Sequence, residues 1–443
     1  MTFKSRFAPS PTGLLHIGNA RSAVINWAHI ISKSGEFILR VDDTDSVRSK
    51  KEYEDAIKND LKWLGLEWSK TFKQSERFKI YQERIVQLKK TKRLYPCFES
   101  PEELSLKRKN LLVSGKPPIY DRSALNLSET EIQNKIEKGK KPHWRFQLEE
   151  RVVEWNDLIK NTVAFDCAKL SDPILIREDD SLLYHLPSVV DDIEEKITDI
   201  IRGEDHITNT AFHIQLFEAM KAPIPLFGHH PFLIDEHGKG FGKRLGSLSI
   251  QRLKEEGFEN ITLLNYLLSI GTSKNLSKEK NKKILSSNFN IKNLAKSPPK
   301  FSKKIITNLN KEILQSYNYS EIKTKFEDLK LSNASKDFWT FIKNNINYFH
   351  EAYDWWKVIY SDEVYPTKEQ DYLNIAAKLL PNDPFNNSTW QEWTSKINRK
   401  TGRLGRDLYM PLRMALTGQN KGPELKFLMP LLNKQQVLKK LSS

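Results

Sequence analysis

Residues 6–21, RFAPSPTGLLHIGNAR, carry the chain from an expected strand through a sharp turn into an expected helix. The spacing of apolar residues just before the turn predicts a short strand over residues 2–7. Two prolines and a glycine between residues 9 and 13 then interrupt regular structure. From Ile17 onward, apolar residues recur every three or four positions, which predicts a helix that stops near Gly35.

The first turn of this expected helix carries His16 and Gly18. Backbone N–H groups at a helix start are unpaired and the helix dipole is positive there, so a phosphate is favoured. Gly18 leaves room for a flat base or ribose, and His16 can donate a hydrogen bond as charge develops on a phosphate. The alternative interpretation is a sharp turn in which the histidine only caps the helix.

An apolar run at residues 36–43 predicts a second strand, and strand, helix and strand in this order are typical of a parallel βαβ unit. Ligands bind beyond the carboxyl ends of such strands, and both Arg6 and Asp42 lie near such an end. Asp42 is suited to hold an ammonium group and Arg6 a carboxylate, as a free amino acid would require. The alternative is that these residues form ordinary surface ion pairs.

Arg202 directly follows another apolar run. A second arginine aimed at the same cleft favours a dicarboxylic ligand, because a neutral amide would not compensate two buried guanidinium groups equally. The alternative is a structural pair with Glu204 or Asp205. Further on, residues 237–247, HGKGFGKRLGS, predict a glycine-rich basic loop whose N–H groups and lysine suit a pyrophosphate leaving group, although a generic turn has the same composition.

The charge of the chain indicates a polyanionic partner. Among 443 residues, 71 Lys and Arg stand against 56 Asp and Glu, a net charge of +15, which favours nucleic acid before a membrane surface. A basic surface that only faces solvent is the alternative. The two cysteines, Cys97 and Cys167, predict no disulfide framework and fit a reducing, cytoplasmic location. Neither a secretory signal nor a run of about 18 apolar residues is visible, so no membrane association is expected.

The composition changes near residue 273. Residues 274–311 contain eleven lysines and one acidic residue, Glu279, which favours a phosphate-facing surface, with a solubilising exposed region as the alternative. Beyond them, the aromatic residues between 338 and 356 recur at helical spacing. We therefore expect them in the core of a helical domain and not as platforms for bases.

Taken together, these motifs resemble the class I aminoacyl-tRNA synthetases in the form of bacterial glutamyl-tRNA synthetases. The resemblance is dense at RFAPSPTGLLHIGNARSA (6–23), at FILRVDDTDSVRS (37–49), and at residues 184–210 and 239–250. It extends from about residue 3 to the C-terminus and is thinner between 275 and 400.

The resemblance implies a set of substrates and contacts. ATP with Mg²⁺ would be a substrate, held by His16, Gly18, Asn19, Lys243 and Arg244, of which His16, Lys243 and Arg244 would stabilise charge during the reaction. Glutamate would be held by Arg6, Ala8, Ser10, Asp42, Tyr184, Ser188 and Arg202.

The sequence also departs from the family pattern. Asn19 stands at the last position of the His-x-Gly-His element, Asp42 replaces the usual glutamate, and Ser188 replaces the usual asparagine. In the second signature, Lys-x-Ser-Lys, Gly240 and Gly242 replace the first lysine and the serine. These changes leave the rate of activation and the details of side-chain recognition open.

The segment after residue 95 resembles the connective domain that grips the tRNA acceptor end. Many relatives hold a small zinc site there, built from several cysteines. In this sequence Glu99 and Ser123 stand at the matching positions, with Tyr120 nearby, and Cys97 is the one cysteine left. One cysteine cannot complete a four-ligand zinc site, so we expect no structural zinc and no other protein-held metal.

The expected fold is α/β, a Rossmann-type parallel-sheet catalytic domain with an inserted α+β acceptor-binding domain, followed by an all-helical C-terminal half. We expect six segments, namely the first half of the catalytic domain (1–94), the connective insertion (95–181), the second half of the catalytic domain (182–228), a stem-contact region with the Lys-x-Ser-Lys-like loop (229–302), and two helical anticodon-binding subdomains (303–380 and 381–443).

The resulting hypothesis is a monomeric glutamate–tRNA ligase that forms glutamyl-adenylate and passes the glutamyl group to the 3′-terminal adenosine of tRNA-Glu. Two alternatives stay open. The chain could glutamylate tRNA-Gln, alone or with tRNA-Glu, because anticodon choice depends on a few C-terminal side chains. It could also be a catalytically impaired tRNA-binding homologue, which Asp42 and the altered 239–244 loop favour.

Overall fold

The computed structural model describes residues 2–240, 248–273, 275–331, 333–361, 363–366 and 368–442. The chain divides into two compact units. The first contains Met1–Leu253 and Leu263–Ser302, and the second contains Lys254–Thr262 and Lys303–Ser443. No helix in the described ranges is both long and apolar enough to span a membrane.

A parallel sheet forms the centre of the first unit. Its five strands lie in the order β10-β9-β1-β2-β3, with β1 at Lys4–Phe7, β2 at Glu36–Val41, β3 at Lys70–Lys73, β9 at Asp199–Gly203 and β10 at Leu226–His230. All neighbouring pairs are parallel, so the carboxyl ends of the strands meet at one edge. The α/β fold with a parallel catalytic sheet is confirmed.

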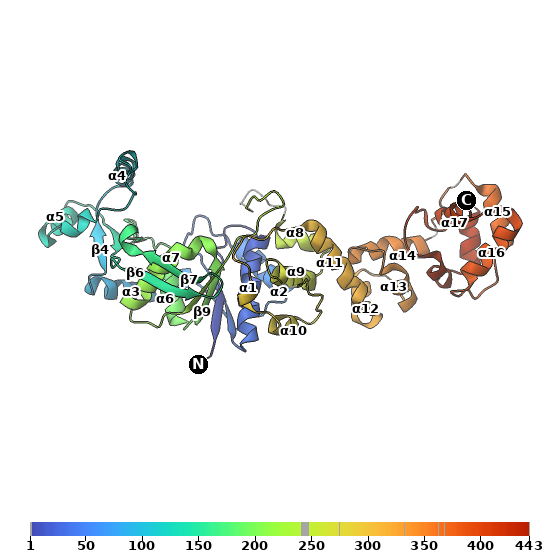
Figure 1. Cartoon of the computed structure of the whole chain (residues 1–443), viewed down its shortest axis with the longest axis horizontal. Helices are drawn as coiled ribbons and strands as arrows, with labels where there is room; N and C mark the ends of the chain where they lie inside the picture. Colours follow the sequence, from blue (N-terminus) through green and yellow to red (C-terminus); the bar gives the residue numbers. More distant parts are fainter. Residues whose placement is uncertain are drawn as a thin grey trace. The chain divides into compact units, whose positions relative to one another are not determined.

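Helix α1 (Ile17–Ser32) packs on β1, β2 and β9 (Figure 1). Its apolar residues lie on the face that packs against the sheet, and Ile17, Ala20, Val24 and Ile30 are fully buried. The predicted strand, turn and helix at the start of the chain are thus confirmed. Other helices of this unit are α2 (Lys51–Trp63), α3 (Phe78–Lys90), α6 (His185–Glu194), α7 (Ile207–Ala219) and α10 (Lys282–Ser287).

The 95–181 segment has the expected mixture of helix and strand. A three-stranded antiparallel sheet contains β4 (Leu94–Cys97), β5 (His143–Phe146) and β8 (Ile174–Ile176), and a hairpin contains β6 (Val152–Asp157) and β7 (Asn161–Asp166). Helices α4 (Pro101–Val113) and α5 (Glu129–Glu137) complete it. Apolar residues of these strands share one core with the parallel sheet, so β6 is fixed against the catalytic fold.

The second unit is helical. Its elements are α11 (Lys303–Ser316), α12 (Tyr319–Asp328), α13 (Lys336–Ile342), α14 (Ala352–Tyr360), α15 (Gln370–Lys378), α16 (Thr389–Thr401), α17 (Gly405–Thr417) and α18 (Lys434–Leu441), shown in orange to red in Figure 1. Helices α8 (Ile250–Glu255) and α9 (Asn260–Ser269) contain two of the three points where the chain changes unit, and the third lies directly before α11.

Aromatic side chains fill the core of this helical unit, as the sequence predicts. Phe338, Trp339 and Phe341 are buried, and Trp355 and Trp356 pack against the same cluster. Between residues 423 and 433 the chain forms only short 3-10 helices, at Leu425–Phe427 and Met429–Leu431, before α18 begins.

Candidate active site

A cleft of about 660 Å³ opens at the carboxyl ends of β1, β2, β9 and β10. Strand order reverses there, since the chain proceeds from β1 to β2 on one side and from β9 to β10 on the other, and ligands of open α/β sheets bind at such a reversal. The predicted residues that line the cleft are Arg6, Ala8, Ser10, His16, Gly18, Asn19, Asp42, Tyr184 and Arg202. Lys243 and Arg244 lie outside the described residues.

His16 caps the start of α1. Its Nδ1 accepts hydrogen bonds from the backbone N–H groups of Gly18 at 3.1 Å and Asn19 at 3.3 Å. Burial lowers the pKa of the imidazole, so the ring is neutral and its proton lies on Nε2. The capping interpretation is therefore correct in this structure, and the same geometry leaves an N–H group for a ligand.

Gly18 makes room for that ring. A β-carbon at this position would lie 3.0 Å from Cε1 and 3.1 Å from Nδ1 of His16, which is too close for an undisturbed contact. The glycine therefore fixes the position of the histidine, in addition to leaving the helix start open.

Asp42 is held by an arginine that the sequence analysis did not assign. Arg40, fully buried at the end of β2, donates to both oxygens of Asp42 at 2.6 and 3.1 Å. Burial raises the pKa of Asp42 and the charge of Arg40 opposes the rise. Arg40 also donates to the carbonyl and the hydroxyl of Ser188 at 3.1 and 3.2 Å. Ser188 is completely buried and lies outside the lining of the cleft, so its effect on a ligand would pass through Arg40.

The guanidinium of Arg6 forms an ion pair with the carboxylate of Asp192. Nε and one terminal nitrogen donate to the two oxygens of Asp192, at 3.0 and 3.3 Å. Arg40 donates to the same carboxylate at 3.0 Å. Arg6, Arg40, Asp42 and Asp192 thus form one buried network with two positive and two negative groups.

Arg202 has a different environment. It is buried, yet it makes no ion pair with any described residue. Its nitrogens donate to uncharged acceptors, namely Tyr184 Oη at 3.1 Å, His213 Nδ1 at 3.4 Å, Thr210 Oγ1 at 2.7 Å, His206 O at 3.4 Å and His229 Nε2 at 3.4 Å. Burial lowers the pKa of the guanidinium, and the more distant charge of Asp192 opposes this shift only in part. The expected alternative of a pair with Glu204 or Asp205 is absent among the described contacts.

Arg21 is another buried cation at the cleft. It donates to the carbonyl oxygens of Pro231 at 2.8 Å and Ile270 at 3.2 Å, and its Nε has no acceptor among the described residues. Burial lowers its pKa to about 10. In the described lining, four arginines stand against the carboxylates of Asp42 and Asp205, so the cleft attracts anions.

Comparison with known proteins decides the family. Residues 2–308 match the family described as tRNA synthetases class I (E and Q), catalytic domain, and residues 302–443 match the family described as anticodon binding domain. The chain belongs to the class I tRNA synthetases (E and Q). Members of this class use ATP as a substrate, generally with Mg²⁺.

Relatives of this synthetase resemble it over nearly its whole length. Glutamate–tRNA ligase 2 of Bartonella tribocorum is 45% identical and glutamate–tRNA ligase 1 of Rickettsia bellii is 42% identical, each with 99% of both chains covered. The solved structure of a glutamate tRNA ligase from Elizabethkingia meningosepticum in complex with its amino acid is 26% identical. It matches with a TM-score of 0.85 and covers 100% of this chain and 98% of that one.

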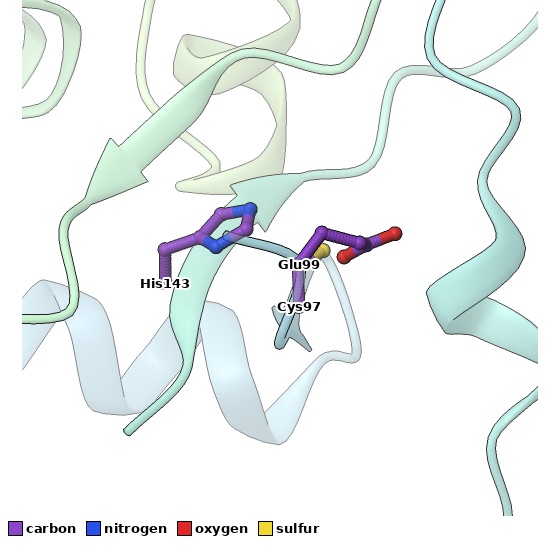
Figure 2. Close-up of side chains that lie close together, drawn as sticks. All are labelled: Cys97, Glu99 and His143. Carbon is purple, nitrogen blue, oxygen red and sulfur yellow. The ribbon is translucent and has the colours of Figure 1, made fainter. Parts of the chain in front are cut away.

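The synthetase also has a cluster of possible metal ligands away from the cleft. One ligand atom each of Cys97, Glu99 and His143 lies within 4.8 Å of the others. Figure 2 shows these three side chains close together. Glu99 Oε2 and His143 Nε2 have no hydrogen-bond partner in the described part of the chain. His143 lies more than 40 positions away in the sequence and carries no local signal of a metal ligand, and only the pairing of β5 with β4 brings it beside Cys97. Three protein ligands are still one fewer than a closed structural zinc site needs.

Acidification should destabilise the synthetase, because several histidines around Arg202 are neutral in the fold. Burial, aided by Arg202, lowers the pKa of His185 to about 4 and that of His206 to about 4. In the unfolded chain these histidines take up protons below about pH 6.5, whereas in the folded protein they stay neutral. The free energy of unfolding therefore decreases as the pH falls from that value towards 4. For His185 the loss is about 1 kcal/mol at pH 5.5. Asp191, whose pKa burial raises to about 6, offsets part of the loss.

Thermal unfolding at about pH 7.5 and 5.5 checks this expectation. The melting temperature of the wild type should fall on acidification, and that of His185→Gln should fall less. An equal shift in both proteins would show that His185 is not neutral in the fold.

Proposed function

We propose that this synthetase is a glutamate–tRNA ligase that activates L-glutamate with ATP and transfers the glutamyl group to tRNA-Glu. The observation that carries the proposal is Arg202, a buried guanidinium at the cleft that forms an ion pair with no described carboxylate. The carboxylate of a glutamate side chain would supply the missing charge, whereas the amide of glutamine would leave it unbalanced. The names of the relatives described above support the same substrate.

In the proposed complex, Arg202 and Tyr184 bind the side-chain carboxylate of glutamate. Asp42 faces the ammonium group, and the turn with Ala8 and Ser10 lies beside the remaining polar atoms of the amino acid. Arg6 acts through its pair with Asp192, and Ser188 acts through Arg40, which holds Asp42 in place.

ATP is proposed to lie over the start of α1. Gly18 and Asn19 border the proposed ATP site, and Nε2–H of His16 donates a hydrogen bond to a phosphate oxygen of ATP. Lys243 and Arg244, assigned by resemblance, would contact the outgoing phosphates. An oxygen of the glutamate α-carboxylate attacks the α-phosphorus, the bond to the bridging oxygen breaks, and pyrophosphate leaves with that electron pair. The protein contributes by holding the attacking oxygen in line with the leaving group and by stabilising the negative charge that develops on the phosphates.

Mg²⁺ enters with ATP and neutralises charge on its phosphates. It is usually held by one or two carboxylates together with substrate oxygens. Asp205 lines the cleft and makes no ion pair with Arg202, so it would be a suitable protein ligand.

The tRNA is proposed to contact the 95–181 segment with its acceptor end and the helical unit with its anticodon. The lysine-rich stretch 274–311 supports a phosphate-facing surface between these regions of the sequence. Whether the anticodon of tRNA-Gln is also accepted is decided by the aminoacylation experiment described at the end of the Discussion.

Exchange of labelled pyrophosphate into ATP tests the proposal at its first step. We expect exchange that depends on glutamate and on tRNA, and little exchange with glutamine or aspartate. Exchange with glutamine instead of glutamate would contradict the assignment of Arg202. The absence of exchange with any amino acid, while tRNA is still bound, would support the catalytically impaired alternative.

We further propose that the cluster of Cys97, Glu99 and His143 holds no structural zinc. Burial raises the pKa of the Cys97 thiol to about 12, and Glu99 Oε1 already accepts hydrogen bonds from Tyr120 at 2.8 Å and Ser123 at 3.2 Å. Elemental analysis of protein purified without chelators should find far less than one zinc per chain. One zinc per chain that disappears in His143→Ala would contradict this prediction.

A further inference from the structure

A line of buried hydrogen bonds connects the hairpin β6–β7 to Arg202. Asp157, the last residue of β6, accepts hydrogen bonds at Oδ1 from the N–H groups of Ile159 at 2.9 Å, Lys160 at 2.9 Å and His229 at 3.1 Å. Its other oxygen, Oδ2, lies 2.5 Å from Nδ1 of His229. The side chains of Asp157 and His229 are both completely buried.

These contacts fix which nitrogen of His229 carries the proton. Burial lowers the pKa of the imidazole, so the ring is neutral. Burial acts to raise the pKa of Asp157, but hydrogen bonds from His229 and from backbone N–H groups outweigh it and lower the pKa to about 2. A carboxylate beside Nδ1 requires the proton there, which leaves a lone pair on Nε2.

The lone pair on Nε2 faces the donors around Arg202. Nε of Arg202 lies 3.4 Å away, and the hydroxyl of Thr210, 2.9 Å away, accepts in turn from Arg202 at 2.7 Å. If the proton were on Nε2, two N–H donors would face each other and the guanidinium would turn away.

We infer that Asp157 and His229 are positioning residues that aim Arg202 at the side-chain carboxylate of glutamate. This inference rests on the proposed function. The imidazole ring of His229 separates the negative charge of Asp157 from the guanidinium of Arg202. A directly paired carboxylate, such as Asp192 beside Arg6, would orient an arginine equally well but would also neutralise it. The neutral ring orients Arg202 and keeps its charge for the substrate.

The substitution Asp157→Asn tests the inference, because its geometry is constrained. Three backbone N–H groups point to the position of Oδ1, so the amide oxygen must take that place and the NH₂ group must face His229. The NH₂ group then donates to Nδ1, and the imidazole proton moves to Nε2, towards Arg202. We expect the KM for glutamate to rise about 10- to 100-fold, as for other carboxylates that orient a histidine, with kcat and the KM for ATP nearly unchanged.

The direction in which the affinity for glutamate changes distinguishes an orienting role of Asp157 from a purely electrostatic one. Removing a negative charge near Arg202 would, by charge alone, strengthen binding of an anionic substrate. A weaker affinity for glutamate therefore reports a loss of orientation.

Asp199→Asn is the matched control. Asp199 also forms a buried contact with a histidine, His29, at 2.9 Å, and it has no hydrogen bond with Arg202 among the described contacts. Both variants should lower the melting temperature, but Asp199→Asn should leave the KM for glutamate unchanged. An equal rise in KM in both variants would reduce the effect to general destabilisation and overturn the inference.

A spectroscopic measurement tests the inference without using activity. Long-range ¹H–¹⁵N spectra of ¹⁵N-histidine-labelled protein distinguish the two neutral forms of the imidazole. His229 should carry its proton on Nδ1 in the wild type and on Nε2 in Asp157→Asn. The opposite form in the wild type would overturn the inference even if glutamate is activated, whereas a wild type without glutamate activation would refute the proposed function instead.

Thr210→Val provides a second variant if Asp157→Asn does not fold. It removes the hydroxyl between His229 and Arg202 and leaves the contact between Asp157 and His229 in place. The KM for glutamate should rise several-fold, and an unchanged KM would overturn the inference.

Discussion

Replacing Arg202 by alanine should lower kcat/KM for glutamate by about 10²-fold or more. Truncating one partner of a buried, hydrogen-bonded charge pair costs about 2–5 kcal/mol, and in the proposed complex the partner is the substrate carboxylate. The measurement is the dependence of tRNA-stimulated pyrophosphate exchange on glutamate concentration. Arg202→Lys should recover only part of the loss, because an ammonium keeps the charge but not the planar fork.

Stability distinguishes this prediction from a structural role. Removing Arg202 leaves no described carboxylate unpaired, so the fold should not lose an ion pair. Arg40→Ala, in contrast, removes the partner of Asp42 and one partner of Asp192 and should cost about 3–5 kcal/mol. A variant Arg202→Ala that unfolds like Arg40→Ala, or that keeps the glutamate kinetics of the wild type, would reassign Arg202 to structure.

His16→Ala should slow adenylate formation by about 10²- to 10³-fold, the usual effect of removing one preorganised donor to a developing charge. The same change also removes the cap of α1, which should cost about 1 kcal/mol of stability. Single-turnover formation of adenylate measures the first effect, and thermal or chemical unfolding measures the second.

His16→Asn separates the two roles. Asparagine is a good N-cap and can accept the hydrogen bonds from Gly18 and Asn19, but it lacks an N–H group at the position of Nε2. Stability should therefore recover while adenylate formation stays slow. Recovery of both would mean that His16 acts only as a cap and takes no part in the chemistry.

The sequence was enough to predict that several of the candidate residues lie together. Asp42 and Arg202 follow or end apolar runs and Arg6 lies near the end of a short strand, and the rule that ligands lie beyond the carboxyl ends of parallel strands predicts that they meet at one cleft. The local pattern also predicted α1 and the place of His16 at its first turn.

The partners of these residues could not be predicted from the sequence. Arg6 pairs with Asp192, 186 positions away, and no local pattern selects that carboxylate. Arg40 lies within an apolar strand, where a buried charge is costly unless it is paired, so its presence was a usable signal of a buried network. Asp157 is harder to recognise from the sequence, because the two strands of its hairpin are largely exposed and only Val153 and Asp157 in them are buried.

Aminoacylation with labelled glutamate and ATP, run in parallel on tRNA-Glu and tRNA-Gln transcripts, tests the central claim most directly. The account predicts that label appears on tRNA-Glu and depends on ATP. Label mainly on tRNA-Gln would make the chain a misacylating enzyme, and bound tRNA without label on either transcript would contradict the proposal that this chain is a glutamate–tRNA ligase.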